Sequence, residues 1–256
     1  MRPLFILLYL ITLICSCQPK ESKHVLFIGN SLTYYHDMPS MLQEILRQNN
    51  SKISVEQSTQ PGISLSDHLN LNSTIEKLNS KHWDFVILQE GTVRALIPEA
   101  MKYQFGPSVV KFDSIIKQKG GTTILYESYP ISKYPEKYCY PSFLISDRLA
   151  EKDYCSAELL NSDQEFEVIR KSFSELNNLI NCKIAPVGTV FELCKKKYPE
   201  LQLFESNDDT HPSKLGSYLI ACVFFRALTN ENASELNINF GLNPADTKII
   251  RELVDL

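Results

Sequence analysis

Three residues with the functional groups for acyl transfer lie far apart in this sequence. Ser31 stands in the run VLFIGNSLT, and Asp208 comes three positions before His211 in the segment NDDTHPSKLGSYL near the C-terminus. A serine hydroxyl is a poor nucleophile until a base removes its proton, and a histidine held by an aspartate is such a base. We therefore predict that Ser31, His211 and Asp208 act together as nucleophile, base and orienting acid.

Each of these residues also has a structural alternative. Asn30 and Ser31 can form an ordinary turn or cap a helix, and Asp208 or Asp209 can cap the helix that follows. Asp209 also competes with Asp208 as the carboxylate that orients His211. The hypothesis therefore depends on the combination and not on any one residue.

The Asp-x-x-His segment is predicted to be a loop that enters a helix. Residues 207–210 are turn and cap formers, and Pro212 suits the first turn of a helix over Pro212–Thr229. Such a loop would present the side chains of Asp208 and His211 together.

Apolar runs alternate with segments of helical spacing along the rest of the chain. We predict strands at His24–Gly29, Lys52–Gln57, Asp84–Leu88, Thr122–Tyr126 and Lys183–Val187. We predict further helices at Met38–Asn49, Ser64–Leu78, Phe105–Lys119, Phe166–Ile180 and Val190–Lys197. This order indicates an α/β fold with a five-stranded parallel sheet that helices cover on both faces.

Three of the candidate residues follow predicted strands within a few positions. Ser31, Gly62 and Gln89 come after the first, second and third strands. Because sites in parallel sheets lie at the carboxyl ends of the strands, we expect these residues to meet at one edge.

The composition is that of a globular protein. The chain has 256 residues, of which 43% are hydrophobic and 22% charged, and this fits one large domain. A formal net charge of −4 and the absence of a Lys/Arg-rich stripe argue against a nucleic-acid partner. Without a CxxC or a His/Cys cluster we expect no metal and no cofactor.

The first 16 residues are predicted to be a lipoprotein signal peptide. Met1-Arg2 supplies a positive start, and Leu4–Ile14 is apolar but shorter than the roughly 20 residues of a membrane-spanning helix. Ile14-Cys15-Ser16-Cys17 resembles a bacterial lipobox, which implies that Cys17 is the first mature residue and carries a lipid. An ordinary signal peptide with a bystander cysteine is the alternative.

The mature protein is accordingly expected to be an exported lipoprotein in the periplasm or at the cell surface. Residues 17–23 would tether the domain 24–256, and the lipid would be its only membrane contact. Five cysteines remain, and an odd number leaves at least one free. Cys139 and Cys155 flank one irregular segment and are the preferred disulfide pair, whereas Cys222 in an apolar run is expected in the core.

That irregular segment, at about 127–163, is rich in tyrosine and interrupted by proline. Loops of this length in compact domains are usually functional or disordered. Because it follows the fourth predicted strand, we expect it to overhang the site. A surface insertion with its own small cluster is the alternative.

Three motifs resemble those of the SGNH/GDSL hydrolase family. IGNSLT matches the first, with Ser31 at the nucleophile position, and TQPGIS resembles the second, with Gly62 at the oxyanion glycine. DDTHPS matches the last, with Asp208 and His211 as acid and base, and Asp209 stands one residue too close to His211 for this pattern. The resemblance extends from Val25 to about Leu228.

The resemblance implies a flavodoxin-like three-layer α/β/α sandwich. It also implies an oxyanion hole made by the backbone N–H groups of Ser31 and Gly62 and a side-chain amide of a third motif. The usual Gly-x-Asn-Asp is absent there, and LQEGT takes its place, similar to a family branch that includes some carbohydrate acetylesterases. Gln89 is then the expected amide donor. Glu90 is expected to orient Gln89, to bind an arginine such as Arg94, or to line the pocket.

The implied activity is ester hydrolysis through an acyl-enzyme. Tyrosines of the insertion could stack on sugar rings, so an O-acetyl carbohydrate is the first expected substrate and a lipid or short acyl ester the second. The altered third motif leaves open a non-catalytic glycan-binding protein on the same scaffold. His36, just after the nucleophile turn, is a further residue that could reach the pocket. Oligomeric state is not predicted.

Overall fold

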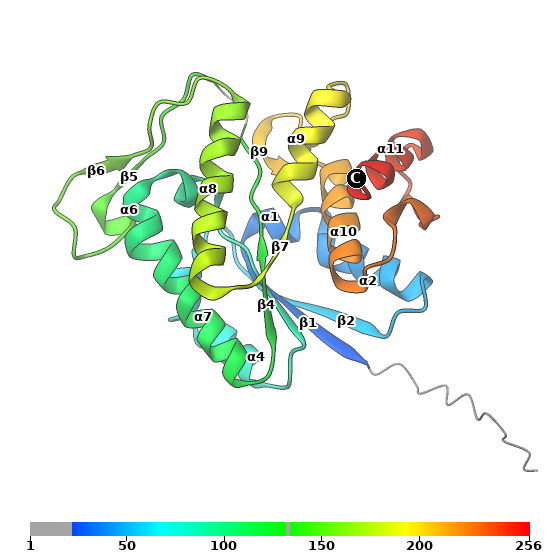
Figure 1. Ribbon diagram of the computed structural model, residues 1–256, viewed down its shortest axis with the longest axis horizontal. Coiled ribbons are helices and arrows are strands. Elements are labelled where there is room, and N and C mark those ends of the chain that lie inside the picture. Colours follow the sequence, from blue (N-terminus) through cyan, green and yellow to red (C-terminus); the bar gives the residue numbers. More distant parts are fainter. Residues whose placement is uncertain (1–21, 132–133) are drawn as a thin grey trace, which may run out of the picture.

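A five-stranded parallel sheet forms the centre of the computed structural model, which describes residues 22–131 and 134–256 (Figure 1). Its strands are β1 (Lys23–Gly29), β2 (Ile53–Thr59), β3 (Phe85–Leu88), β4 (Thr122–Tyr126) and β7 (Lys183–Ala185). Their spatial order, β2-β1-β3-β4-β7, is that of flavodoxin-like sheets. The predicted parallel sheet is confirmed. The predicted signal peptide and Cys17 lie outside the described residues.

Successive residues of each strand pack against opposite faces of this sheet. In β1, Phe27 belongs to one apolar cluster and Ile28 to the other. In β3 the same alternation separates Ile87 from Leu88. Because both faces are buried, the strands read as continuous apolar runs.

Helices cover both faces (Figure 1). One layer contains α2 (Met38–Gln48), α9 (Val187–Lys197), α10 (Lys214–Thr229) and α11 (Pro244–Val254). The other contains α4 (Asn72–Asn79), α7 (Gly106–Gln118) and α8 (Ser162–Ile180). The predicted three-layer α/β/α sandwich is confirmed, although α11 was not among the predicted helices.

The helix predicted over Ser64–Leu78 is two helices, α3 (Leu65–His68) and α4. Ser64 and Asp67 form a capping box that starts α3. The ring of His68 is buried, with Nε2 2.9 Å from the carbonyl oxygen of Gly29 and Nδ1 2.7 Å from Oγ1 of Thr74. These contacts hold the end of α3 against β1, and the chain has to turn before α4 begins.

The segment before α10 also differs from the prediction. The loop expected there is a strand, β9 (Asp208–Pro212), paired antiparallel with β8 (Phe204–Glu205). Pro212 ends this strand and is not in the helix. Ser213 caps α10 instead, because its side chain accepts the N–H of Gly216.

Short elements complete the path around the sheet edge. They are α1 (Ser31–Tyr34), a 3₁₀ turn (Tyr35–Asp37), α5 (Thr92–Leu96), α6 (Pro98–Ala100), a π turn (Met101–Phe105) that runs into α7, and a 3₁₀ turn (Ala233–Glu235) before α11.

The irregular insertion between β4 and α8 contains a small hairpin. Its strands are β5 (Cys139–Pro141), followed by a 3₁₀ turn (Ser142–Leu144), and β6 (Asp153–Cys155). A disulfide joins Cys139 to Cys155, which confirms the predicted pair. Cys222 is fully buried in the core, as predicted.

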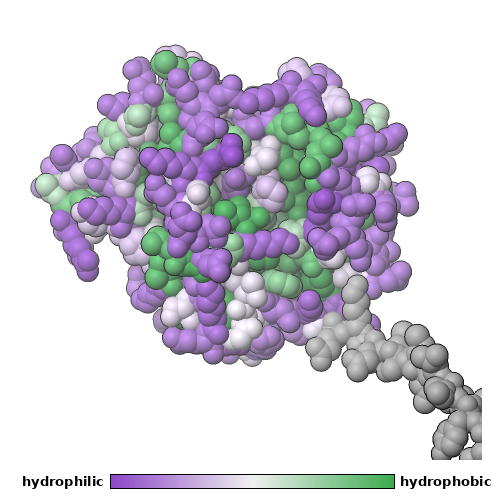
Figure 2. Space-filling model, in the orientation of Figure 1, coloured by the Kyte–Doolittle hydropathy of each residue, from purple (hydrophilic) through white to green (hydrophobic). Residues whose placement is uncertain are grey.

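The face of the molecule seen in Figure 2 is mostly hydrophilic and is broken by apolar patches. In the two described ranges, no helix has both the length and the apolar character needed to cross a membrane.

Candidate active site

The candidate nucleophile lies where β1 turns into α1. Asn30 caps α1, its Oδ1 accepting the N–H of Leu32 at 3.2 Å, so that Ser31 is the first helical residue. Gly29 has no room for a side chain, because a Cβ would lie 2.4 Å from Oε1 of Gln89. The turn therefore holds Ser31 at the carboxyl edge of the sheet, partly exposed to solvent.

The structure joins Ser31, His211 and Asp208 in one chain of hydrogen bonds. Nε2 of His211 lies 2.8 Å from Oγ of Ser31, and Nδ1 of His211 bonds to Oδ2 of Asp208. This geometry suits an imidazole that carries its proton on Nδ1 and can accept the serine proton at Nε2. Asp208, and not Asp209, supplies the carboxylate that binds the His211 ring.

The backbone fixes the Asp208 carboxylate. Its Oδ1 accepts the N–H of Thr210 at 2.8 Å and the N–H of His211 at 3.1 Å. Partial burial acts to raise the pKa of Asp208, but the hydrogen bonds from the His211 ring and from the two N–H groups outweigh it and lower this pKa below its ordinary value. Asp208 is therefore ionised at neutral pH.

Tyr35 was not predicted as a site residue, yet its ring stacks on the ring of His211 with centroids 4.1 Å apart. Its carbonyl accepts the hydroxyl of Ser217 at 3.0 Å. The neighbouring His36 does not join the triad but pairs with Glu205 of β8. This pair ties the segment after the nucleophile to the hairpin that carries Asp208 and His211. An aromatic residue just after the nucleophile helix was the only sequence signal for this contact.

Gln89 supports the nucleophile turn. Its Oε1 accepts the N–H of Asn30 at 2.7 Å and the hydroxyl of Thr33 at 3.0 Å. Its Nε2 is closed off from solvent and has no hydrogen-bond acceptor within the described parts of the chain. An oxyanion donor has to face the space that the substrate enters. The role of Gln89 as a donor therefore stays a prediction.

The Gly62 loop is tied to the same turn. Nδ2 of Asn30 donates to the carbonyl of Ile63 at 3.1 Å, which places the loop beside Ser31. Gly62 is exposed and has a φ of +65°, a conformation that favours glycine. Across residues 22–131 and 134–256, no hydrogen-bond acceptor is found for the backbone N–H of Ser31 or of Gly62. Two unpaired N–H groups near the nucleophile are what an oxyanion hole requires.

Glu90 is completely buried beside this loop. It accepts the N–H of Leu65 at 2.8 Å and lies 3.5 Å from Nη1 of Arg94, so the predicted arginine partner is present. Burial raises the pKa of Glu90 although Arg94 and the N–H groups oppose this. Arg94 also donates to Gln104 at 3.0 Å and lies over the ring of Tyr140. The network thus connects the Gly62 loop to the insertion.

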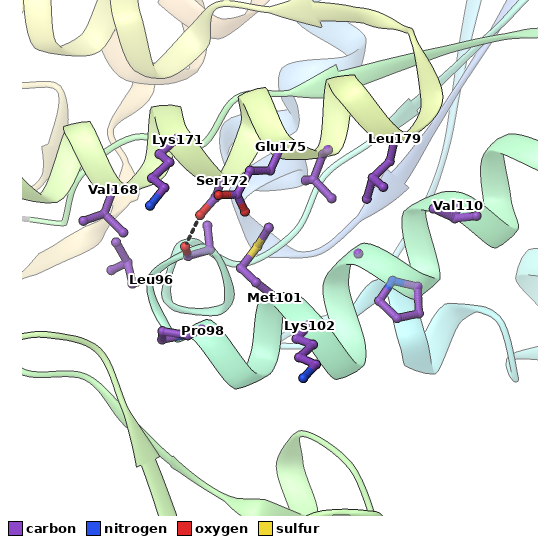
Figure 3. Close-up of a pocket in the computed structure, with 14 residues that line it drawn as sticks. Leu96, Pro98, Met101, Lys102, Val110, Val168, Lys171, Ser172, Glu175 and Leu179 are labelled. Atoms are coloured by element: carbon purple, nitrogen blue, oxygen red, sulfur yellow. Dashed lines mark hydrogen bonds between the residues drawn. The ribbon is translucent and has the colours of Figure 1, made fainter.

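Two hollows differ in their relation to the triad. An apolar groove of about 620 Å³ lies between α5–α7 and α8, with Leu96 and Met101 on one side and Leu179 of α8 on the other (Figure 3). No triad residue lines it. A smaller cleft of about 380 Å³ is lined by Asp208 and the insertion. Asp208 is the one triad residue that lines this cleft. Because the reacting groups define a site and volume does not, the sheet edge where Ser31 meets His211 is the candidate active site.

No group of three or more His, Cys, Asp or Glu side chains in the described part of the chain is arranged to hold a metal ion.

Protein-family models and curated proteins were searched and none matches the chain. Solved structures do match. A DUF4886 family protein from Bacteroides uniformis has a TM-score of 0.71 and 19% identity over 92% of this chain and 94% of that one. A proposed SGNH hydrolase from Slackia heliotrinireducens has a TM-score of 0.60 and 23% identity over 80% and 98%.

An acetyl xylan esterase is also similar, with a TM-score of 0.58 and 16% identity over 80% of this chain and 99% of that one. At these identities the likeness concerns the fold. It shows that the chain has the α/β/α architecture found in proteins of the SGNH type.

Proposed function

We propose that this chain is a member of the SGNH/GDSL hydrolases and a serine esterase that works through an acyl-enzyme. The observation that carries the proposal is the hydrogen-bonded chain from Ser31 through His211 to Asp208, with 2.8 Å between the serine oxygen and the imidazole. Three residues from two distant segments converge in the geometry that proton removal from serine requires. A scaffold used only for binding would need no such arrangement.

The reaction has two halves. Oγ of Ser31 attacks the ester carbonyl carbon while Nε2 of His211 takes the hydroxyl proton. The tetrahedral intermediate then collapses, the C–O bond to the alcohol breaks, and His211 returns the proton to the leaving oxygen. Water then attacks the acyl-enzyme while His211 takes its proton. The bond between the acyl carbon and Oγ of Ser31 breaks, His211 returns the proton to Oγ, and the acid is released. Asp208 stabilises the imidazolium in both halves.

The oxyanion of each tetrahedral intermediate requires preorganised donors. We assign the backbone N–H groups of Ser31 and Gly62 to this role, because both are unpaired at the site edge. The amide nitrogen of Gln89 is the third proposed donor, since a buried unpaired N–H group next to a nucleophile calls for a functional explanation. It would have to become accessible when substrate binds.

The proposed substrate is an O-acetyl ester on a carbohydrate. The tyrosine-rich insertion beside Asp208 and the likeness to an acetyl xylan esterase support this choice. A long acyl chain would require an apolar channel at the nucleophile, but the apolar groove in Figure 3 is lined by other residues. The lipase alternative thus has no specific observation in its favour.

Labelling with a fluorophosphonate probe tests the proposal. We expect the wild-type protein to be labelled and Ser31→Ala to remain unlabelled. His211→Ala is expected to label far more slowly, because its serine lacks a base. A folded wild-type protein that neither labels nor hydrolyses p-nitrophenyl acetate would instead indicate a binding protein.

Export and lipidation at Cys17 belong to the same proposal. They rest on the sequence resemblance alone and place the enzyme near extracellular glycans. Mass spectrometry of the protein from its native host is expected to find a diacylglyceryl mass on Cys17 as the first residue. An unlipidated N-terminus would contradict this.

A further inference from the structure

A polar cleft of about 380 Å³ lies on the Asp208 side of the triad. One wall is the acid segment, residues 207–210, and the other is the start of the insertion, with Ile131, Glu136 and Tyr138. Asp208 belongs to the first wall and binds the His211 ring through its Oδ2. Neither Ser31 nor His211 lines the cleft, so the sugar of an O-acetyl ester held at Ser31 would reach it past the imidazole ring.

The wall formed by the insertion is held in place by several contacts. The disulfide of Cys139 lies next to Tyr138, and the N–H of Tyr138 donates to Oγ of Ser156 at 3.1 Å. Two backbone hydrogen bonds, of 2.9 and 2.8 Å, pair Glu136 with Leu159. These contacts preorganise the wall, which lowers the entropy cost of binding.

A further hydrogen bond links the two walls. The hydroxyl of Tyr129 donates to the carbonyl of Thr210 at 3.3 Å, and the ring of Tyr129 stacks on Phe191. The spacing between the insertion and the acid segment is therefore set by a fully buried side chain. The shape of the cleft is therefore fixed by packing between its two walls.

The side chains of the cleft define the ligand chemistry. Tyr138 is partly buried and supplies an aromatic surface. Glu136 and Asn207 supply oxygen acceptors, and Asp208 and Asp209 add negative charge beside them, with no lysine or arginine among the described residues that line the cleft. Sugar hydroxyls donate to such oxygens, whereas a carboxylate on the ligand would be repelled.

We propose that this cleft is a subsite for a neutral sugar ring of the substrate, with Tyr138 as its aromatic platform and Glu136 and Asn207 as acceptors for its hydroxyls. The inference rests on the proposed esterase function and specifies its substrate as an O-acetylated neutral oligosaccharide. The insertion is then the element that selects the glycan.

The first test compares two substrates, O-acetylated xylooligosaccharides and p-nitrophenyl acetate, which is too small to occupy the subsite. Tyr138→Ala is expected to lower kcat/KM for the oligosaccharide about tenfold, mainly through KM, and to leave p-nitrophenyl acetate within about twofold. Tyr138→Phe keeps the ring and is the matched control, expected to stay within about threefold on both substrates. Asn207→Ala, at an exposed position, repeats the test without touching the packing.

The proposal is overturned if Tyr138→Ala and Asn207→Ala leave the oligosaccharide kcat/KM unchanged, or lower it for both substrates equally. It is also overturned if the wild-type protein hydrolyses p-nitrophenyl acetate but not the oligosaccharides. If the wild-type protein hydrolyses neither ester and takes no fluorophosphonate label, the esterase function itself fails. The two failures are thus distinguished by the small ester and the label.

The second test reverses the charge of the cleft. Glu136→Lys is expected to raise kcat/KM on O-acetylated oligogalacturonides, which are anionic, by about fivefold, and the gain should fall at high salt. Glu151→Lys places the same charge at an exposed insertion position outside the cleft and should change nothing. Equal effects of the two substitutions on kcat/KM would show that the cleft does not discriminate between substrates by their charge.

Discussion

The phenol ring of Tyr35 lies face to face with the imidazole ring of His211, with centroids 4.1 Å apart and ring planes 10° apart. The two residues after Tyr35, His36 and Asp37, have φ values of 49° and 54°, in the left-handed region. Strained backbone persists only where its surroundings hold it. The packing around this turn therefore keeps Tyr35 in a fixed position. The stacked ring sets the plane in which His211 faces Ser31.

Replacing Tyr35 should slow the reaction. Tyr35→Ala is expected to lower kcat/KM for p-nitrophenyl acetate by about 2- to 30-fold, because an aromatic face stabilises an adjacent cation by ~0.5–2 kcal/mol. Tyr35→Phe keeps the ring and should stay within about twofold of wild type. Steady-state kinetics of wild type and both variants measures the effect, and their melting temperatures show that all three are folded. A Phe variant as slow as the Ala variant would show that ring stacking is not the cause.

Asp208 and its neighbour Asp209 allow a matched test of which carboxylate orients His211. Asp208→Asn should reduce kcat by about 10⁴-fold, because the amide cannot stabilise the imidazolium and favours the wrong imidazole tautomer. Asp209→Asn makes the same chemical change one position away and is expected to retain activity within about threefold. Similar losses in both variants would contradict the assignment of Asp208. Rates are to be compared on the same small ester.

Gln89 should matter for stability as well as for rate. Gln89→Met removes the acceptor of the Asn30 N–H and the Thr33 hydroxyl, and an unsatisfied buried donor costs about 1–3 kcal/mol. Thr33→Val removes one donor and leaves the bond between Gln89 and Asn30, so a smaller loss is expected. Urea unfolding gives the two free energies. If the urea midpoint of Gln89→Met equals that of the wild type, Gln89 does not support the turn.

Glu165, at the start of α8, should make the protein less stable as pH rises. Burial raises its pKa to about 7, although hydrogen bonds from the hydroxyl of Tyr134 and the N–H of Ile131 act in the opposite direction. The folded state then holds a proton that the unfolded chain releases near the ordinary pKa of about 4.3. Stability from this proton is complete below about pH 4 and is lost as pH rises through about 7, a change on the order of 3 kcal/mol.

Glu165→Gln imitates the protonated side chain and tests whether stability falls as pH rises. The variant should match wild type at about pH 4 and be more stable at pH 8, as measured by urea unfolding at each pH. Glu167→Gln, on the exposed side of the same helix, is the control and should show no such divergence. A variant that is less stable than wild type at pH 8 would mean that the ionised carboxylate is the form that holds the insertion.

The sequence was sufficient to predict the sheet, most of its helices and the Cys139–Cys155 bridge. A strand that is buried on both faces has to be apolar at every position, so β1, β3 and β4 could be recognised locally. Helix boundaries were less certain. Ser64–Leu78 has helical spacing throughout, but the contacts of His68 with Gly29 and Thr74 divide it. Those contacts belong to the tertiary structure and leave no local pattern.

At the site, the sequence by itself determined which residue types were present and which of them follow strands. Asp208 and His211 could be paired because both are on one short segment. Only the tertiary structure decided that the ring of His211, 180 positions from Ser31, lies within hydrogen-bond distance of its hydroxyl. It also turned the oxygen of Gln89 toward the nucleophile turn and set Tyr138 opposite the acid segment. These relations depend on distances and side-chain directions between distant segments, which packing determines and residue spacing along the chain does not encode.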